Sequence, residues 1–400
     1  MGKKLVIDTM FCDLRKMQES TLAQYDSIRI SAMIVMTNAR ARELMSRYPF
    51  EMDCMHTLDL DDETTLNTLN GKTLFTGRNT PNGRQYLVVN GMMTITPDAG
   101  DALRQYMGMM INGMVYCPDS LATVLASKAA VNGKVETYPD GAVVLRSNAV
   151  LDRAFALRAE PGRLYWAAKR LIAVDSALDG DELAARGVRF AAREAYLTES
   201  LAESLAPLFD PDTQLTILPD GVTVEQDDLT LNGTALRRLG DSLVVLGDLR
   251  LTEDCAEALS NLEYLQVEGD IYLPESLADA LDAVTETLFD GEVHYLAGKP
   301  LYGKMELTVD QSLLDAFPDG LTLVDCKSVT LAASLTSAAV LERLAFYDCK
   351  EITCPAALES AVRAVSTGVG GVTLSDAPEE AGASGDDAGT QRIDAMSYVL

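Results

Sequence analysis

The chain has 400 residues, 48% of them hydrophobic, and a formal net charge of −27 at pH 7. This apolar content is enough for a folded body, whereas the negative charge disfavours nucleic-acid binding, which depends on clustered Lys and Arg. No stretch approaches the roughly 18 consecutive apolar residues of a membrane-spanning helix, so the sequence predicts none.

Residues 1–26 predict an N-terminal cap for a repeating structure. Lys4–Asp8 alternates like a strand, and Cys12–Tyr25 has the spacing of a short helix. Asp8 interrupts the first apolar run too early for a secretory signal. The seven cysteines, an odd number in a long chain, fit a reducing compartment. We therefore expect a cytoplasmic protein.

Residues 27–375 repeat one phrase: an alternating apolar stretch, a small residue or Gly, a second alternating stretch and a helix-like run. The two clearest copies are centred on Gly247 and Gly269, 22 positions apart. Such a period indicates units that bury their apolar faces against their neighbours. The sequence predicts an α/β repeat solenoid of about 13 strand-corner-strand-helix coils with a parallel β-sheet. In that stack, Gly247 and Gly269 lie side by side on adjacent coils.

Four longer gaps between corners contain Asn-Gly, Asp-Gly or other Gly turns with additional strand-like residues. Asn-Gly and Asp-Gly tolerate the positive φ of tight turns, so these stretches predict hairpins projecting from the stack. Because they recur every two or three coils, they also indicate a larger duplicated block of roughly eighty residues. The four stretches are Leu69–Val89, Val131–Leu145, Thr213–Val224 and Phe289–Tyr302.

Residues 376–400 predict an acidic disordered tail, because Asp376–Thr390 consists mainly of Ala, Gly, Ser, Pro and acidic residues. The last five residues, Met396–Leu400, are apolar again. They are either a short docking peptide or a frayed chain end, and the frayed end is the simpler interpretation.

One strand and one helix-like segment per 20 to 25 residues make the chain similar to leucine-rich repeats over most of residues 27–375. The resemblance implies a solenoid architecture and nothing about binding residues. The Leu-x-x-Leu-x-Leu-x-x-Asn signature of that family is absent. The Asn ladder that satisfies backbone groups inside the turns of that family is therefore not expected.

No motif predicts catalytic, cofactor-binding or metal-binding residues. The two histidines have structural explanations, since His56 takes a predicted corner and His294 alternates along a predicted hairpin strand. Carboxylates are plentiful, so a carbohydrate-active enzyme on a parallel β-coil remains the alternative. It requires two acids converging in a groove roughly 5 to 9 Å apart. A calcium-stabilised solenoid is a third possibility.

The favoured function is a non-enzymatic cytoplasmic scaffold for protein interaction or for structure, because solenoids present extended surfaces. We expect a protein partner or self-association, with no cofactor, nucleic acid or membrane involved. The contact surface would consist of the projecting hairpins and one face of the sheet. The candidate partner-binding residues are Lys72, Lys134, Trp166, His294, Tyr295, Tyr398 and Leu400.

Overall fold

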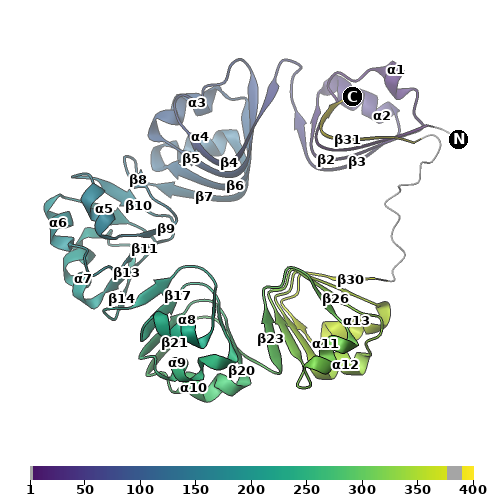
Figure 1. Ribbon diagram of the computed structural model, residues 1–400. Coiled ribbons are helices and arrows are strands. Elements are labelled where there is room, and N and C mark those ends of the chain that lie inside the picture. Colours follow the sequence, from purple (N-terminus) through teal and green to yellow (C-terminus); the bar gives the residue numbers. More distant parts are fainter. Residues whose placement is uncertain (1–2, 376–389) are drawn as a thin grey trace. The chain divides into compact units, whose positions relative to one another are not determined.

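The computed structural model describes residues 3–375 and 390–400, and the fold is α/β with many short parallel strands (Figure 1). Two compact units are present: unit 1 contains Met1–Gly141 and Ala381–Leu400, and unit 2 contains Ala142–Glu380. Every strand pair among the described residues is parallel. Within the same residues, no helix is both long and apolar enough to cross a membrane.

The strands pair in sets of four successive coils, and we call each set, with its helices, a block. In blocks 1 and 2, which form unit 1, each strand runs unbroken through its corner. The strands of block 1 are β31 (Thr390–Val399), β1 (Lys4–Asp13), β2 (Ser27–Thr37) and β3 (Phe50–Asp59). Those of block 2 are β4 (Thr65–Phe75), β5 (Gln85–Ile95), β6 (Gly108–Pro118) and β7 (Ala129–Tyr138).

In blocks 3 to 5, which form unit 2, most coils contribute two shorter strands that belong to two neighbouring sheets. Block 3 contains β8 (Val143–Val144), β9 (Asn148–Val150), β10 (Leu164–Trp166), β11 (Arg170–Ala173), β12 (Arg189–Ala191), β13 (Glu194–Thr198) and β14 (Gln214–Leu218). Block 4 contains β15 (Thr223–Glu225), β16 (Leu229–Leu231), β17 (Ser242–Val245), β18 (Leu249–Leu251), β19 (Tyr264–Val267), β20 (Ile271–Pro274), β21 (Glu286–Phe289) and β22 (Val293–Leu296). Block 5 contains β23 (Lys299–Tyr302), β24 (Leu307–Val309), β25 (Leu321–Val324), β26 (Ser328–Leu331), β27 (Leu344–Tyr347), β28 (Glu351–Cys354), β29 (Ser366–Thr367) and β30 (Val372–Leu374).

The blocks have nearly equal length. Blocks 2 to 5 begin at residues 65, 143, 223 and 299, which are 78, 80 and 76 positions apart. This spacing agrees with the eighty-residue duplication predicted from the sequence.

A short helix follows most coils, and Figure 1 shows the helices of each block on one side of its sheet. Several begin at an Asn, Asp or Thr whose side chain accepts a hydrogen bond from a backbone N–H of the first turn, as at Asn38 and Asp310. The helices are α1 (Glu19–Leu22), α2 (Ala39–Arg47), α3 (Gly100–Gln105), α4 (Ala122–Lys128), α5 (Arg153–Arg158), α6 (Gly180–Ala185), α7 (Glu199–Leu205), α8 (Gly233–Arg238), α9 (Ala256–Ser260), α10 (Ala278–Asp282), α11 (Gln311–Ala316), α12 (Ser337–Arg343) and α13 (Glu359–Ala364). Single 3₁₀ turns span Pro97–Ala99, Asp119–Leu121, Ala206–Leu208, Glu253–Cys255, Glu275–Leu277 and Ala356–Leu358.

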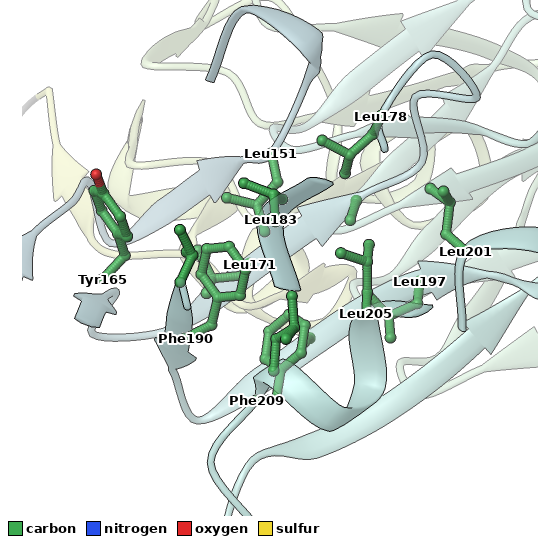
Figure 2. Packing of buried hydrophobic residues seen from close by; sticks show 14 of the residues in the cluster. Leu151, Tyr165, Leu171, Leu178, Leu183, Phe190, Leu197, Leu201, Leu205 and Phe209 are labelled. Carbon is green, nitrogen blue, oxygen red and sulfur yellow. The ribbon is translucent and has the colours of Figure 1, made fainter. Parts of the chain in front are cut away.

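Each block has its own apolar core between strands and helices. In block 3, the strand residues Leu171 and Leu197 pack with Leu183 of α6 and Leu205 of α7, and all four are fully buried (Figure 2). Helices of five to seven residues would be marginal alone, so this packing is what stabilises them.

Gly247 and Gly269 lie on adjacent coils, as predicted. The Gly269 N–H donates to the Gly247 carbonyl oxygen at 3.2 Å, and the flanking strands β17 and β19 pair in register. A Cβ placed on Gly269 would come within 2.6 Å of that same oxygen. Glycine is therefore required here by the close approach of two backbones.

The predicted hairpins are wrong. The Leu69–Val89 stretch contains the end of β4 and the beginning of β5, and these two strands pair in parallel so that Gly71 lies opposite Gly91. The other three stretches contain the fourth coil of a block and the short connection to the next block. Most of their Gly residues take positive φ, as at Gly221, but the chain then continues into another parallel strand. These coils have no helix after the strand. In the sequence they therefore resembled insertions between regular repeats.

The C-terminal segment also differs from expectation. Thr390–Val399, predicted as part of a disordered tail, forms β31 and pairs in parallel along the whole of β1. Ile393, Tyr398 and Leu400 pack against the core of block 1. Residues 376–389 of the predicted tail lie outside the described residues. The predicted cap, residues 1–26, contributes β1 and α1 to the same block.

Candidate functional site

The densest polar clusters in unit 2 lie where neighbouring blocks meet. Arg250 of β18 is buried, and its Nη2 atom lies 3.1 Å from Asp248, 3.4 Å from Asp228 and 3.6 Å from Asp325. The first two carboxylates belong to block 4 and the third to block 5. One guanidinium therefore joins two coils of its own block to the next block.

Tyr272 extends this cluster. It is the register partner of Arg250, whose guanidinium carbon lies 5.8 Å from the ring centroid. The Tyr272 hydroxyl donates a short hydrogen bond to Asp348 of block 5, and the His294 ring stacks on Tyr272 with centroids 4.8 Å apart. Burial, together with the hydrogen bond to Asp348, raises the pKa of Tyr272 above its usual value. The phenol therefore remains a donor at neutral pH.

The same arrangement joins blocks 3 and 4. Arg170 of β11 is only 2% exposed, and its Nη2 atom lies 2.9 Å from Glu194 and 2.8 Å from Glu268. The Tyr196 hydroxyl donates to Glu268, and Arg170 lies 5.6 Å from the Tyr196 ring centroid. Arg170 precedes Arg250 by 80 positions, and Tyr196 precedes Tyr272 by 76 positions. We call these two groups the seam clusters.

Two aspartates of the second seam cluster have unusual backbones. Asp325 and Asp348 are the non-glycine residues with positive φ in the described part of the chain, at 53° and 51°. They lie one coil apart in block 5, since Val324 pairs with Tyr347. Asp is among the few side chains that tolerate this conformation. The strain places both carboxylates at the corner that faces Arg250 and Tyr272.

Unit 1 has a related buried arginine. Arg15 donates from Nε to Asp13 at 2.9 Å and from Nη1 to the Thr64 carbonyl oxygen at 2.7 Å. Burial alone would raise the pKa of Asp13, but the hydrogen bonds from Arg15 hold it below its usual value. Arg15 thus links β1 of block 1 to the start of block 2.

The carboxylates at the corners of block 4 form a ladder. Asp228, Asp248 and Asp270 each accept a hydrogen bond from the backbone N–H of the next coil, at 3.0, 2.9 and 2.8 Å. Burial raises the pKa of Asp248, and the negative charge of Asp228 adds to the shift. Within the described residues, no group of three or more His, Cys, Asp or Glu is arranged to hold a metal ion. The ladder therefore uses these three carboxylates to join successive coils.

Block 2 contains an asparagine ladder that the sequence analysis missed. Asn90, Asn112 and Asn132 each donate to the asparagine of the preceding coil at 2.9 to 3.0 Å, starting from Asn70. The ladder ends at the Nε2 atom of His56, 3.0 Å from Asn132. The signal was an Asn-Gly pair at each of the four corners, which we interpreted in part as hairpin turns.

The predicted partner-binding residues do not form one site. Lys72 and Lys134 are exposed on the outer strands β4 and β7 of block 2, and Lys134 forms an ion pair with Glu136. Their register places Met92 and Met114 between them, one residue per strand. We call Lys72, Met92, Met114 and Lys134 the Lys-Met row.

The other predicted residues are more enclosed than expected. Trp166 is buried in β10, and His294 lies in the parallel strand β22 against Tyr272. Tyr295, the next residue, is exposed. Tyr398 and Leu400 pack on block 1, and the Leu400 N–H donates to the Asp13 carbonyl oxygen at 3.1 Å. They belong to a paired edge of the sheet instead of a loose docking peptide or a frayed end.

Comparisons with known proteins return no relative: no family model, no curated protein and no solved structure matches this chain.

Proposed function

We propose that the chain is a repeat solenoid that serves as a non-enzymatic scaffold, for protein interaction or for structure. One observation carries the proposal. The buried arginines of unit 2 join coils and blocks in the seam clusters, whereas the Lys-Met row of block 2 places exposed lysines and half-buried methionines at one position of successive strands. A surface that repeats with the strand spacing is what a scaffold offers to an extended partner.

The Lys-Met row of block 2 is the contact surface that we favour, in place of the hairpins. Met92 and Met114 offer flexible, polarisable contacts, and Lys72 and Lys134 add positive charge on an otherwise acidic chain. These properties fit an acidic segment of a protein partner or of a second copy of the chain. A location in the cytoplasm fits the seven cysteines, which are reduced thiols and are mostly buried.

The alternative, a carbohydrate-active enzyme, requires two carboxylates free to act as acid and base. The three acids of the block 4 corner ladder accept backbone hydrogen bonds, and two of them, Asp228 and Asp248, are paired with Arg250. No observation favours the enzyme over the scaffold.

The test is capture of partners by the purified full-length chain, with the double variant Lys72→Glu/Lys134→Glu as the probe. The matched control is Lys16→Glu/Lys327→Glu, which makes the same change of charge at exposed positions elsewhere. We expect cross-linked partners, or self-association measured by light scattering, to be lost in the first variant and kept in the control. Equal retention in both variants would exclude this row as the contact surface. Hydrolysis of a polysaccharide by the wild type would contradict the scaffold.

A further inference from the structure

Block 1 carries a three-residue phrase once in each of its four strands: an acid or Ser, a small residue or Cys, and Met. The copies are Asp394-Ala395-Met396, Asp8-Thr9-Met10, Ser31-Ala32-Met33 and Asp53-Cys54-Met55. The scaffold proposed above does not require this repetition, and neither does the core of the block.

Strand register brings the four copies side by side. Asp8 pairs with Asp394 on one side and with Ser31 on the other, and Ser31 pairs with Asp53. Residues two positions apart in a strand share a face of the sheet. The paired residues on either side bracket the methionines, as Thr9–Ala32 and Phe11–Ile34 do for Met10 and Met33, so the four methionines take one corner position per strand beside the row of carboxylates. We call Met396, Met10, Met33 and Met55 the methionine row.

None of the four methionines belongs to the main core of block 1, although Met33 is partly buried against a second apolar cluster that contains Ile34 and Met36. Met396 and Met55 are 73% and 74% exposed, although Met is usually buried. All four methionines and the three aspartates line one hollow of about 770 Å³. The hollow is open to solvent and is lined by thioether sulfur atoms, carboxylates and small side chains.

We propose that the methionine row binds a soft monovalent metal ion, Cu(I), with the aspartate row supplying negative charge nearby. Thioether sulfur is a soft donor that selects Cu(I) over harder ions such as Ca(II) and Mg(II). Neighbouring strands are about 4.8 Å apart, and metal–sulfur bonds in proteins are about 2.3 Å long. An ion between two methionines of adjacent strands can therefore bond both sulfur atoms without a change of the backbone.

Charge separates this row from the similar row in block 2. The Lys-Met row has Asn at the positions where block 1 has Asp, and two of its four members are lysines. Lys72 places a positive charge beside Met92, whereas Lys134 is paired with Glu136. In block 1 Asp8 is paired with Arg392, so Asp53 and Asp394 supply most of the negative charge beside the methionine row. The Lys-Met row is therefore a control within the same chain.

Cys54 is the one competing soft donor within the phrase itself. It alternates with Asp53 and Met55 along β3 and packs with the core residues of block 1. Its side chain is on the opposite face from the methionine row. Metal binding by the row should therefore be independent of this thiol.

The experiment is calorimetric titration of the purified full-length chain with Ag(I), a stable probe for Cu(I), in chloride-free buffer. We expect saturable binding by the wild type. In the Cys54→Ser background, which removes the one cysteine of the seven that is not buried, replacement of all four methionines by Leu, which keeps apolar bulk, should abolish it. Met92→Leu/Met114→Leu and Cys54→Ser should leave binding unchanged. Asp8→Asn/Asp53→Asn should weaken it about tenfold or more, as loss of supporting groups does at metal sites.

Circular dichroism of each variant checks that the fold is kept. Wild-type binding that survives in the folded four-Leu variant would overturn the proposal, as would binding that disappears with Cys54→Ser. If the row instead serves as an apolar contact for a protein, the wild type shows no saturable Ag(I) binding. These outcomes do not depend on the scaffold proposal, whose test uses block 2.

Discussion

Buried arginines, each shared by acids of two neighbouring blocks, are the residues on which unit 2 most depends. Arg170 contacts Glu194 of its own block and Glu268 of the next. A buried charge is costly unless it is paired, so the stabilising effect of such a cluster depends on all its members being present.

Replacement of Arg170 by Met should therefore lower the free energy of unfolding by about 2 to 4 kcal/mol, because two partly buried carboxylates lose their counter-charge. Urea unfolding followed by the fluorescence of Trp166, the single tryptophan, reports on the same block. The control is Arg104→Met, which removes an exposed ion pair with Asp101 and should change stability by less than about 0.5 kcal/mol. Equal midpoints for both variants would contradict the role assigned to Arg170.

A second prediction concerns the effect on stability of replacing the corner glycines of block 2. Gly113 has φ of 140°, and a Cβ there would overlap the Gly91 carbonyl oxygen, whereas a Cβ on Gly71 would meet nothing within 4 Å. Gly113→Ala should cost more than about 3 kcal/mol. Gly71→Ala should cost only the about 1 to 2 kcal/mol of a left-handed backbone. Thermal melting followed by circular dichroism measures both, and similar melting temperatures would refute the close stacking of the corners.

Among the strands, β31 has the most unusual position, because the last residues of the chain pair with the first. Arg392 lies 2.9 Å from Asp8, and the Tyr25 hydroxyl donates to Gln391 at 2.6 Å. The strand covers an edge of β1 that would otherwise expose unpaired backbone groups.

Ile393→Ser should loosen β31, since Ile393 packs on the core of block 1. The expected result is faster hydrogen exchange of the amides of Lys4–Asp13. Val399→Ser changes an exposed residue of the same strand and should leave this exchange as in the wild type. If Ile393→Ser has no effect on β1, the pairing of the two chain ends is not stabilising in solution.

The strand phrase itself was predictable, and its connections were not. Alternating apolar residues and the Gly247–Gly269 spacing were sufficient to predict the parallel ladder of block 4, because the repeat can be recognised from short stretches of sequence. Asn70-Gly71 and Pro219-Asp220-Gly221 were misread because a Gly with positive φ suits both a hairpin and a corner. Only pairing across the sheet distinguishes the two, and that pairing is not local.

The candidate sites were less predictable for the same reason. Arg170 and Glu268 are 98 positions apart in the sequence, so no local sequence pattern predicts that they are in contact. The Asp-x-Met phrase of block 1 was visible in the sequence, but its fourth copy lies at the other end of the chain. Its meaning depended on β31 completing the block, whereas composition alone favoured a disordered tail.

At the scale of the whole molecule, the described residues form five blocks of four coils, and a period of about eighty residues relates blocks 2 to 5. Successive coils pair in parallel at the positions where the sequence predicted hairpins. Lys72 of β4 and Met92 of β5 are register partners in this ladder, whereas a hairpin within Leu69–Val89 would not pair them.

The measurement is disulfide trapping in Lys72→Cys/Met92→Cys, since adjacent parallel strands bring Cα atoms within the range of a disulfide bond. The control pair is Lys72→Cys/Asn90→Cys, displaced along β5 by two positions. Mild oxidation followed by mass spectrometry of the unreduced digest should show the 72–92 cross-link in most molecules and little 72–90 cross-link. Absence of the 72–92 bond, or an excess of the displaced one, would contradict the parallel ladder.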